Sequence, residues 1–233
     1  MATTSQGEAR TGRARTPLEE CGIDAGCLGE AEVLARAEQV AGAVTRYRAT
    51  SPMVEVWDRH LASEFDAHDV DATMDTMVDD PYLLHVPVIT GGTGRDGVRR
   101  FYADHFIPKI PADWQITEIS RTVGDDQVVD EMVTTFTHDV EIDFLLPGVP
   151  PTGRHVEVAI VAIGAFRGSE VRYEHIYWDQ ASVLAQIGLL DQTGLPVAAV
   201  EQVRKLLDDA GPFNALMGAE PLGWPRPGRS RTV

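Results

Sequence analysis

Acidic, basic and aromatic side chains adjoin in residues 173–179, which read Tyr-Glu-His-Ile-Tyr-Trp-Asp. Glu174 and His175 are the acid/base groups of this segment, because either side chain can give or take a proton near neutral pH. Apolar walls around an ionisable group move its pKa, which suits proton transfer. The segment therefore predicts an acid/base catalytic site at the end of a strand. A buried ion pair would give the same sequence pattern.

Alternation along this strand separates the two groups. Successive strand side chains point to opposite sides, so Glu174 shares a face with Trp178 and His175 lies on the other. We expect at most one of the pair to face a pocket, unless a bulge intervenes. Glu174 is the more unusual of the two, because a carboxyl group in apolar surroundings has a raised pKa and could act as an acid or base. A buried Glu174 paired with Arg172 or Arg121 is an equal alternative.

A long apolar strand is predicted over residues 127–145, with Met132, Phe136 and His138 on its apolar face. A neutral imidazole there could act as a base or donate a hydrogen bond to a carbonyl. A core histidine with satisfied hydrogen bonds is the equal alternative. His138 is the expected partner of the acid/base group on the last strand.

A short apolar strand over residues 82–86 carries Tyr82 and His85, which could orient a polar substrate group. Ordinary strand packing with hydrogen-bonded polar tips is the alternative. The further residues expected to contact substrate are aromatic or apolar: Tyr102, Met132, Phe136 and Trp178.

Other titratable residues are assigned structural roles. Asp179 precedes an apolar pattern of helical spacing over residues 180–190, so it is predicted to cap a helix rather than to act in catalysis. His85, His138 and Glu174 or His175 have the composition of a metal site, but nothing in their spacing requires one. We expect no metal and no cofactor. The remaining histidines are interpreted as surface or capping groups: His60, His68, His105 and His155.

Charge and composition limit the classes of partner. The 233-residue chain has a net charge of −16 and a hydrophobic fraction of 43%, which fits one main globular domain. An acidic body repels nucleic acids and anionic membrane surfaces. The sequence has neither an apolar run of about 18 residues nor a start resembling a signal peptide. We expect a cytoplasmic protein that binds a small, largely apolar molecule.

Helical patterns precede β patterns along the chain. Helices are predicted over 53–65, 70–77 and 96–105, followed by antiparallel strands over 115–123, 127–145, 154–166 and 170–178. Strands this long must coil, so an α+β fold is expected, with a cone-shaped curved antiparallel sheet packed on N-terminal helices. The predicted organisation is a flexible tail over 1–28, a helical extension over 29–50, the α+β domain over 51–192, a C-terminal helical extension over 193–217 and a flexible tail over 218–233.

The glycine-punctuated run 81–105, the long strands and the Glu-His-Ile-Tyr-Trp-Asp segment resemble the nuclear transport factor 2-like superfamily, and within it the SnoaL-like polyketide cyclase branch. The resemblance covers about residues 53–191. It implies a cone-shaped α+β barrel with a mostly apolar pocket, commonly in a homodimer formed through the sheets. Its members include isomerases, cyclases, dehydratases, epoxide hydrolases and binding proteins, so the fold does not fix the function.

The residues and the resemblance together predict a cofactor-independent acid/base enzyme of secondary metabolism. It would act as a cyclase, isomerase or dehydratase on a small, largely apolar carbonyl, epoxide or lactone compound. Hydrolysis of an epoxide or lactone by activated water is one alternative, since the chain has no nucleophile elbow. A non-catalytic ligand-binding or dimerisation module is the other.

Overall fold

The computed structural model describes residues 51–208 and 212–217. All of them belong to the second of two units, Arg48–Val233. The predicted tails over 1–28 and 218–233 and all of the predicted extension over 29–50 lie outside the described residues. The domain boundaries therefore stay predictions.

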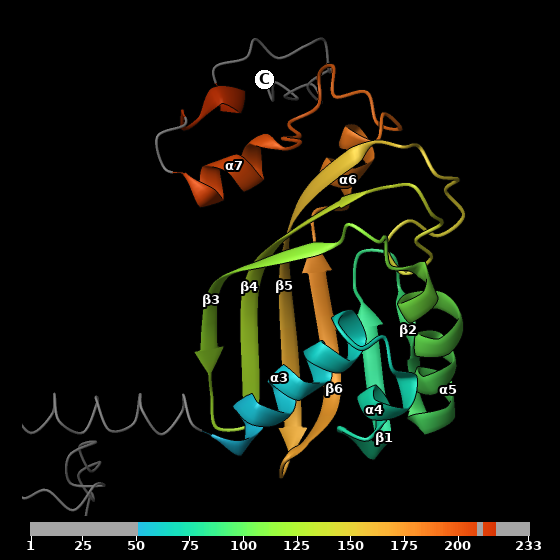
Figure 1. Ribbon diagram of the computed structural model, residues 1–233. Coiled ribbons are helices and arrows are strands. Elements are labelled where there is room, and N and C mark those ends of the chain that lie inside the picture. The colour runs from blue at the N-terminus through green and yellow to red at the C-terminus, as the bar shows by residue number, and fades with distance from the viewer. Residues whose placement is uncertain (1–50, 209–211, 218–233) are drawn as a thin grey trace, which may run out of the picture. The chain divides into compact units, whose positions relative to one another are not determined.

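A curved six-stranded sheet is the frame of the described residues (Figure 1). Neighbouring strands are antiparallel except β1 and β6, which run parallel. The fold is therefore α+β as predicted, but the sheet is mixed, and it stays open between β2 and β3 instead of closing into a barrel. The spatial order is β2 (Thr90–Thr93), β1 (Met77–His85), β6 (Glu170–Trp178), β5 (His155–Arg167), β4 (Gln127–Thr137) and β3 (Gln115–Val123).

Strand β1 begins earlier than the sequence pattern predicted. Met77 and Val78 are buried core residues of this strand, and Met77 pairs with Val171 of β6. Pro81 lies where the pairing with β6 is irregular. A proline cannot donate to the ladder, so the irregularity accommodates it.

Helix α3 (Pro52–Phe65) lies against the sheet and contacts β4 and β6 (Figure 1). Ser51 caps its first turn and Pro52 occupies its start, which are favourable positions for both residues. A Cβ atom built on Gly164 of β5 would come within 2.6 Å of the Trp57 ring. The glycine therefore lets α3 pack directly on the strand.

The other helices are short. Asp69 caps α4, and Asp179 caps α6 as predicted, each by accepting two backbone N–H groups. None of the described helices is both long and apolar enough to cross a bilayer. The elements are α4 (Val70–Met74), α5 (Gly94–Phe101) with a π-helical turn (Tyr102–Phe106) and a 3-10 turn (Ile107–Lys109), α6 (Gln180–Gln186), α7 (Glu201–Leu207) and a 3-10 turn (Ala215–Met217).

Strand β4 ends at Thr137, well before the predicted end at Leu145. The backbone N–H groups of Leu145 and Leu146 bond to the Ile142 carbonyl, so the apolar residues beyond the strand form a turn. Ile142 and its apolar neighbours are buried there as core-filling loop residues. The apolar pattern therefore correctly predicted that these residues are buried, but it wrongly predicted that they continue the strand.

Candidate active site

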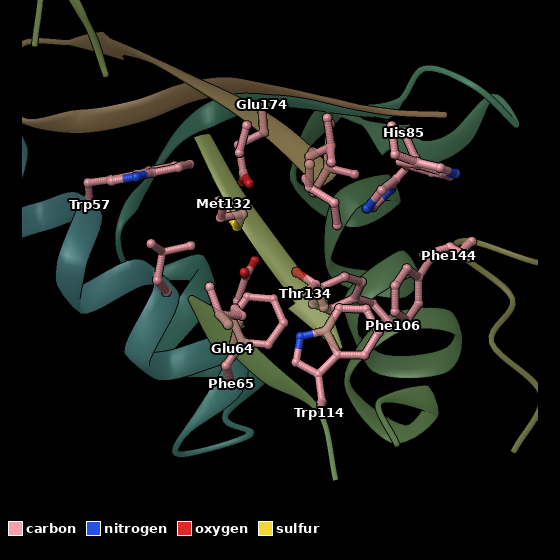
Figure 2. Close-up of a pocket in the computed structure, with 18 residues that line it drawn as sticks. Trp57, Glu64, Phe65, His85, Phe106, Trp114, Met132, Thr134, Phe144 and Glu174 are labelled. Atoms are coloured by element: carbon pink, nitrogen blue, oxygen red, sulfur yellow. The ribbon is translucent and has the colours of Figure 1, made fainter. Parts of the chain in front are cut away.

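A cavity lies between α3 and the inner face of the sheet (Figure 2). The empty space between its lining atoms is about 590 Å³, including the part open to solvent. Its walls are mostly aromatic and aliphatic, and two carboxylates face into it: the lining residues are Trp57, Leu61, Glu64, Phe65, Leu83, His85, Phe106, Trp114, Ile116, Met132, Thr134, Phe144, Leu145, Ile160, Ala162, Glu174, Ile176 and Trp178.

The two carboxylates belong to elements far apart in sequence. Glu64 extends from α3 and Glu174 from β6, and Figure 2 shows both carboxyl groups pointing into the same space. His60 Nε2 lies 3.1 Å from Glu64 Oε1 and 2.9 Å from Glu174 Oε1, so one imidazole joins them. The Tyr102 hydroxyl donates a 2.9 Å hydrogen bond to Glu174 Oε1.

The tautomer of His60 follows from its second nitrogen. Nδ1 lies 2.5 Å from the Thr76 hydroxyl oxygen, and that hydroxyl donates a 2.6 Å hydrogen bond to the Thr73 carbonyl. The Thr76 oxygen must therefore accept from His60 Nδ1–H. Nε2 is left to the two carboxylates, and at least one shared proton must lie between these three groups.

Burial and mutual charge set the pKa values of this network. Burial alone would lower the pKa of His60, but the Glu174 and Glu64 charges and hydrogen bonds outweigh it and raise that pKa to about 10. Burial raises the pKa of Glu64. Burial also opposes ionisation of Glu174, yet the His60 charge and the hydrogen bonds from His60 and Tyr102 lower its pKa. The network therefore favours an imidazolium, an ionised Glu174 and a protonated Glu64.

The prediction that His60 lies at the surface was wrong: the side chain is fully buried. Glu64 was not singled out either. The missed signal was the spacing of Trp57, His60, Leu61 and Glu64, which puts both polar residues on the apolar stripe of α3. A charged pair on such a stripe must find partners inside the protein.

A third buried carboxylate, that of Asp130, holds α3 to the sheet. Trp57 Nε1 donates a 2.8 Å hydrogen bond to Asp130 Oδ2 on β4. Arg121 donates two hydrogen bonds to Asp130 and a third to Asp58. Arg121 is thus the partner of Asp130 and not of Glu174, contrary to the alternative considered from the sequence.

The structure separates Glu174 from His175, as alternation predicted. Glu174 is 4% exposed and faces the cavity, whereas His175 lies on the other face and stacks on Tyr173 with ring centroids 4.6 Å apart. Tyr82 contacts His175 edge-on and is 38% exposed, so it also lies outside the cavity lining. These two predicted site residues are not brought to the carboxylates.

The remaining predicted residues divide between the cavity wall and the layer behind it. His85, Met132 and Trp178 line the cavity. Tyr102 is fully buried behind Glu174, and Phe136 is buried behind Trp114, with ring centroids 4.7 Å apart.

His138 lies beyond the end of β4 and outside the cavity lining, because the strand on which its position was predicted stops one residue earlier. It is fully buried, and its Nδ1 lies 3.1 Å from the Thr152 hydroxyl. Its Nε2 has no hydrogen-bond partner within residues 51–208 and 212–217. The structure therefore does not bring His138 to the acid/base group of the last strand.

Among the described residues, one cluster has the side-chain types of a metal site. Ligand atoms of His60, Glu64 and Glu174 lie within 4.8 Å of one another. This set shares only Glu174 with the combination considered from the sequence. Its three groups are satisfied by one another through a proton, and the same arrangement serves acid/base chemistry without a metal.

Comparison with known proteins identifies the family. The family model for the SnoaL-like domain matches residues 57–173, half of the chain. The chain belongs to the SnoaL-like domain family. This SnoaL-like chain thus has the nuclear transport factor 2-like fold that its sequence resembled, and its buried network lies largely within the matched residues. None of the curated proteins matches the chain.

Solved structures with similar folds share little sequence with this SnoaL-like chain. A candidate SnoaL-like polyketide cyclase from Jannaschia sp. CCS1 is 21% identical, with a TM-score of 0.49, and the match covers 60% of this chain and 94% of that one. A protein from Catenulispora acidiphila DSM 44928 with a ketosteroid isomerase-like fold, solved with trimethylamine, is 20% identical, with a TM-score of 0.45, and the match covers 58% and 94%. At these identities only the fold is compared.

Proposed function

We propose that this protein is a cofactor-independent acid/base enzyme that moves a proton on a small, largely apolar carbonyl compound. The observation that carries the proposal is the pair of buried carboxylates, joined by His60 and facing one apolar cavity. Their surroundings shift the two pKa values in opposite directions. Two titratable groups separated in this way are suited to opposite roles, one as acid and one as base.

Glu174 is the proposed base. Its carboxylate is ionised and faces the cavity, where it would take a proton from the carbon next to a carbonyl group. Glu64, whose pKa is raised by burial, would return a proton to the product. His60 does not line the cavity and acts through the carboxylates, so it is a positioning residue.

Of the predicted catalytic residues, the proposal keeps Glu174 and His85, both of which line the cavity. It leaves out His138 and His175, which do not. Opening of a lactone or epoxide would need a water beside the same carboxylates, and no feature of the cavity favours it over proton transfer. A setting in secondary metabolism and in the cytoplasm remains part of the proposal.

The exchange of hydrogen for deuterium at the carbons beside the carbonyl of 2-indanone, followed by NMR in heavy water, tests this proposal. The protein should accelerate exchange, and Glu174→Gln should reduce the enzymatic rate about 100-fold or more. Glu170→Gln is the matched control, because it removes an exposed carboxylate from the same strand. If the wild-type protein binds 2-indanone without accelerating exchange, a non-catalytic binding role replaces the enzymatic one.

We also propose a homodimer formed through the outer face of the sheet. Val129, Val161, Ile163 and Tyr177 lie there, on neighbouring strands. Val129, Val161 and Ile163 are partly buried in the single chain, and Tyr177 is 41% exposed. An exposed apolar sheet face of this kind is typical of a surface that another protein covers.

A further inference from the structure

Three polar atoms in the cavity wall lack the hydrogen bonds that buried polar atoms normally make. Trp114 Nε1, Thr134 Oγ1 and His85 Nδ1 are buried without a partner among the described residues, and all three residues line the cavity. Buried polar groups are rarely left unpaired in folded proteins. The partner of these atoms must therefore come from whatever enters the cavity.

Aromatic packing fixes the direction of the indole N–H of Trp114. Its ring stacks between Phe65, with centroids 6.1 Å apart, and Phe136, with centroids 4.7 Å apart. A ring held on both faces has little freedom to turn the N–H away. The donor is therefore in place before a ligand arrives, which is the condition for effective electrostatic stabilisation.

Packing also restricts the side chains that carry the other two atoms, Thr134 Oγ1 and His85 Nδ1. Thr134 lies on β4 two residues before Phe136 and is 1% exposed. The His85 ring contacts Phe106 and Phe144, with centroids 5.8 Å and 5.6 Å away. Burial, as the largest cause, lowers the pKa of His85 to about 4, so its imidazole is neutral near pH 7.

The chemistry of these atoms defines what they can bind. An indole N–H donates and cannot accept, so Trp114 requires an acceptor atom on the ligand. In the part of the chain that the structure describes, the lining includes no lysine or arginine but does include Glu64 and Glu174, so an anionic ligand would be repelled. An uncharged oxygen acceptor, such as a ketone carbonyl, fits both conditions.

We propose that Trp114, Thr134 and His85 form an oxygen-binding subsite, which holds the carbonyl oxygen of a flat, uncharged ketone opposite Glu64 and Glu174. The aromatic walls fit the flat skeleton. This assignment rests on the proposed function for its catalytic consequence. When Glu174 takes the proton, the electrons of the broken C–H bond form the C=C bond of an enolate. The negative charge moves to the oxygen that faces Trp114 and Thr134, and returning a proton to carbon restores the ketone.

The subsite can be tested by NMR of the full chain labelled with ¹⁵N-tryptophan. Trp114 is identified by the indole signal that Trp114→Phe removes. Trp57 and Trp178 also line the cavity, but their N–H groups already donate to Asp130 and Gln180, so their signals should shift less than that of Trp114. Addition of 2-indanone should move the Trp114 N–H signal downfield, whereas indane, the same skeleton without the oxygen, should not. Equal responses to both compounds, or none to 2-indanone, would overturn the assignment.

Affinity measurements add a second readout. Trp114→Phe and Thr134→Val should each weaken 2-indanone binding about three- to tenfold, as expected for one lost hydrogen bond, and leave indane binding unchanged. Thr135→Val is the matched control because Thr135 is the next residue on β4 and does not line the cavity. Unchanged 2-indanone affinity in a folded Thr134→Val protein would contradict the subsite even if Trp114→Phe fails to fold.

The experiments distinguish failure of the subsite proposal from failure of the proposal that Glu174 is the base. Glu174→Gln should lose exchange but keep the shift of the Trp114 signal with 2-indanone. If exchange proceeds in the wild type while the Trp114 signal stays unmoved, only the subsite is wrong. If the signal moves but the wild type shows no exchange, the subsite stands as a binding site and the enzymatic proposal fails.

Discussion

The protonation states of His60, Glu64 and Glu174 depend on one another. Each of the two carboxylates contacts the same imidazole nitrogen, so removing any one of the three changes the pKa of the others. The buried position makes this coupling strong because water does not screen it. A substitution here changes proton chemistry and stability together, and tests must separate the two.

A pH dependence of stability follows from His60. Its folded pKa of about 10 exceeds its ordinary value of 6.5. The stabilisation it supplies is therefore full below pH 6.5, declines as pH rises and is lost above about pH 10. Urea unfolding between these pH values should show falling stability for the wild type, and His60→Gln should flatten the decline and cost on the order of 3 kcal/mol at pH 6.5.

The control for this experiment is His155→Gln, which changes an exposed histidine at the start of β5 and should keep the wild-type slope.

Glu174 determines how stability depends on pH in the acidic range. Its pKa is lowered, so its contribution is present above the ordinary value of 4.5 and is lost as pH falls below it. A slope between pH 6.5 and 10 that survives in His60→Gln would show that another group is responsible.

Metal ions are expected to have no effect on the network. His60 Nε2 and the two carboxylates already share a proton, so a cation would have to displace it. Treatment with EDTA, or addition of Zn²⁺ or Mn²⁺, should leave both the thermal midpoint and the 2-indanone exchange rate unchanged. A midpoint that rises with metal in the wild type but not in Glu64→Gln would instead identify a metal site.

Several local features of the site follow from sequence pattern. Alternation correctly separated Glu174 from His175, and helical spacing after Asp179 correctly predicted a cap. The pattern did not find His60 and Glu64, because a histidine and a glutamate on a helix are usually solvated. Only the packing of α3 on β6, which joins residues far apart in the chain, makes them internal.

At the scale of elements, α3 is the part of the scaffold that positions the site. Its Trp57 ring packs on Gly164 of β5 and its indole N–H is held by Asp130 of β4. These two contacts fix the rotation of the helix, and so the positions of His60 and Glu64 one and two turns later. The start of β1 at Met77 and the end of β4 at Thr137 were both predicted wrongly. Pairing with a neighbouring strand and the formation of a turn, not local propensity, set these two strand ends.

Gly164→Ala tests the contact between α3 and β5. The new Cβ would come within 2.6 Å of the rigid Trp57 ring, so helix and strand must separate, at a cost of about 1–3 kcal/mol in unfolding free energy. Gly97→Ala in α5 is the matched control. Apart from the neighbouring backbone of its own helix, no described atom lies within 4 Å of its Cβ position, and Gly97→Ala should stabilise the protein by about 0.5–1 kcal/mol. A neutral Gly164→Ala would mean that α3 shifts without cost.

At the scale of the whole molecule, the outer face of the sheet is expected to determine the oligomeric state. Val161→Glu puts a charge at the centre of the apolar group formed with Ile163 and Tyr177, and light scattering should then report a monomer where the wild type is a dimer. Ala112→Glu, at an exposed loop position, is the control and should stay dimeric. A monomeric wild-type protein would remove the dimer from the proposal.

The parallel pairing of β1 with β6 has a consequence for how the protein is made. His60 and Glu64 are synthesised early, but Glu174 lies on the last strand, and β1 can pair with that strand only after the residues between them have folded or looped out. Such non-local pairing is slow compared with local hairpins. During synthesis on the ribosome, Glu174 therefore stays apart from His60 and Glu64 until nearly the entire domain has emerged. Proton-transfer activity would consequently report the last step of folding.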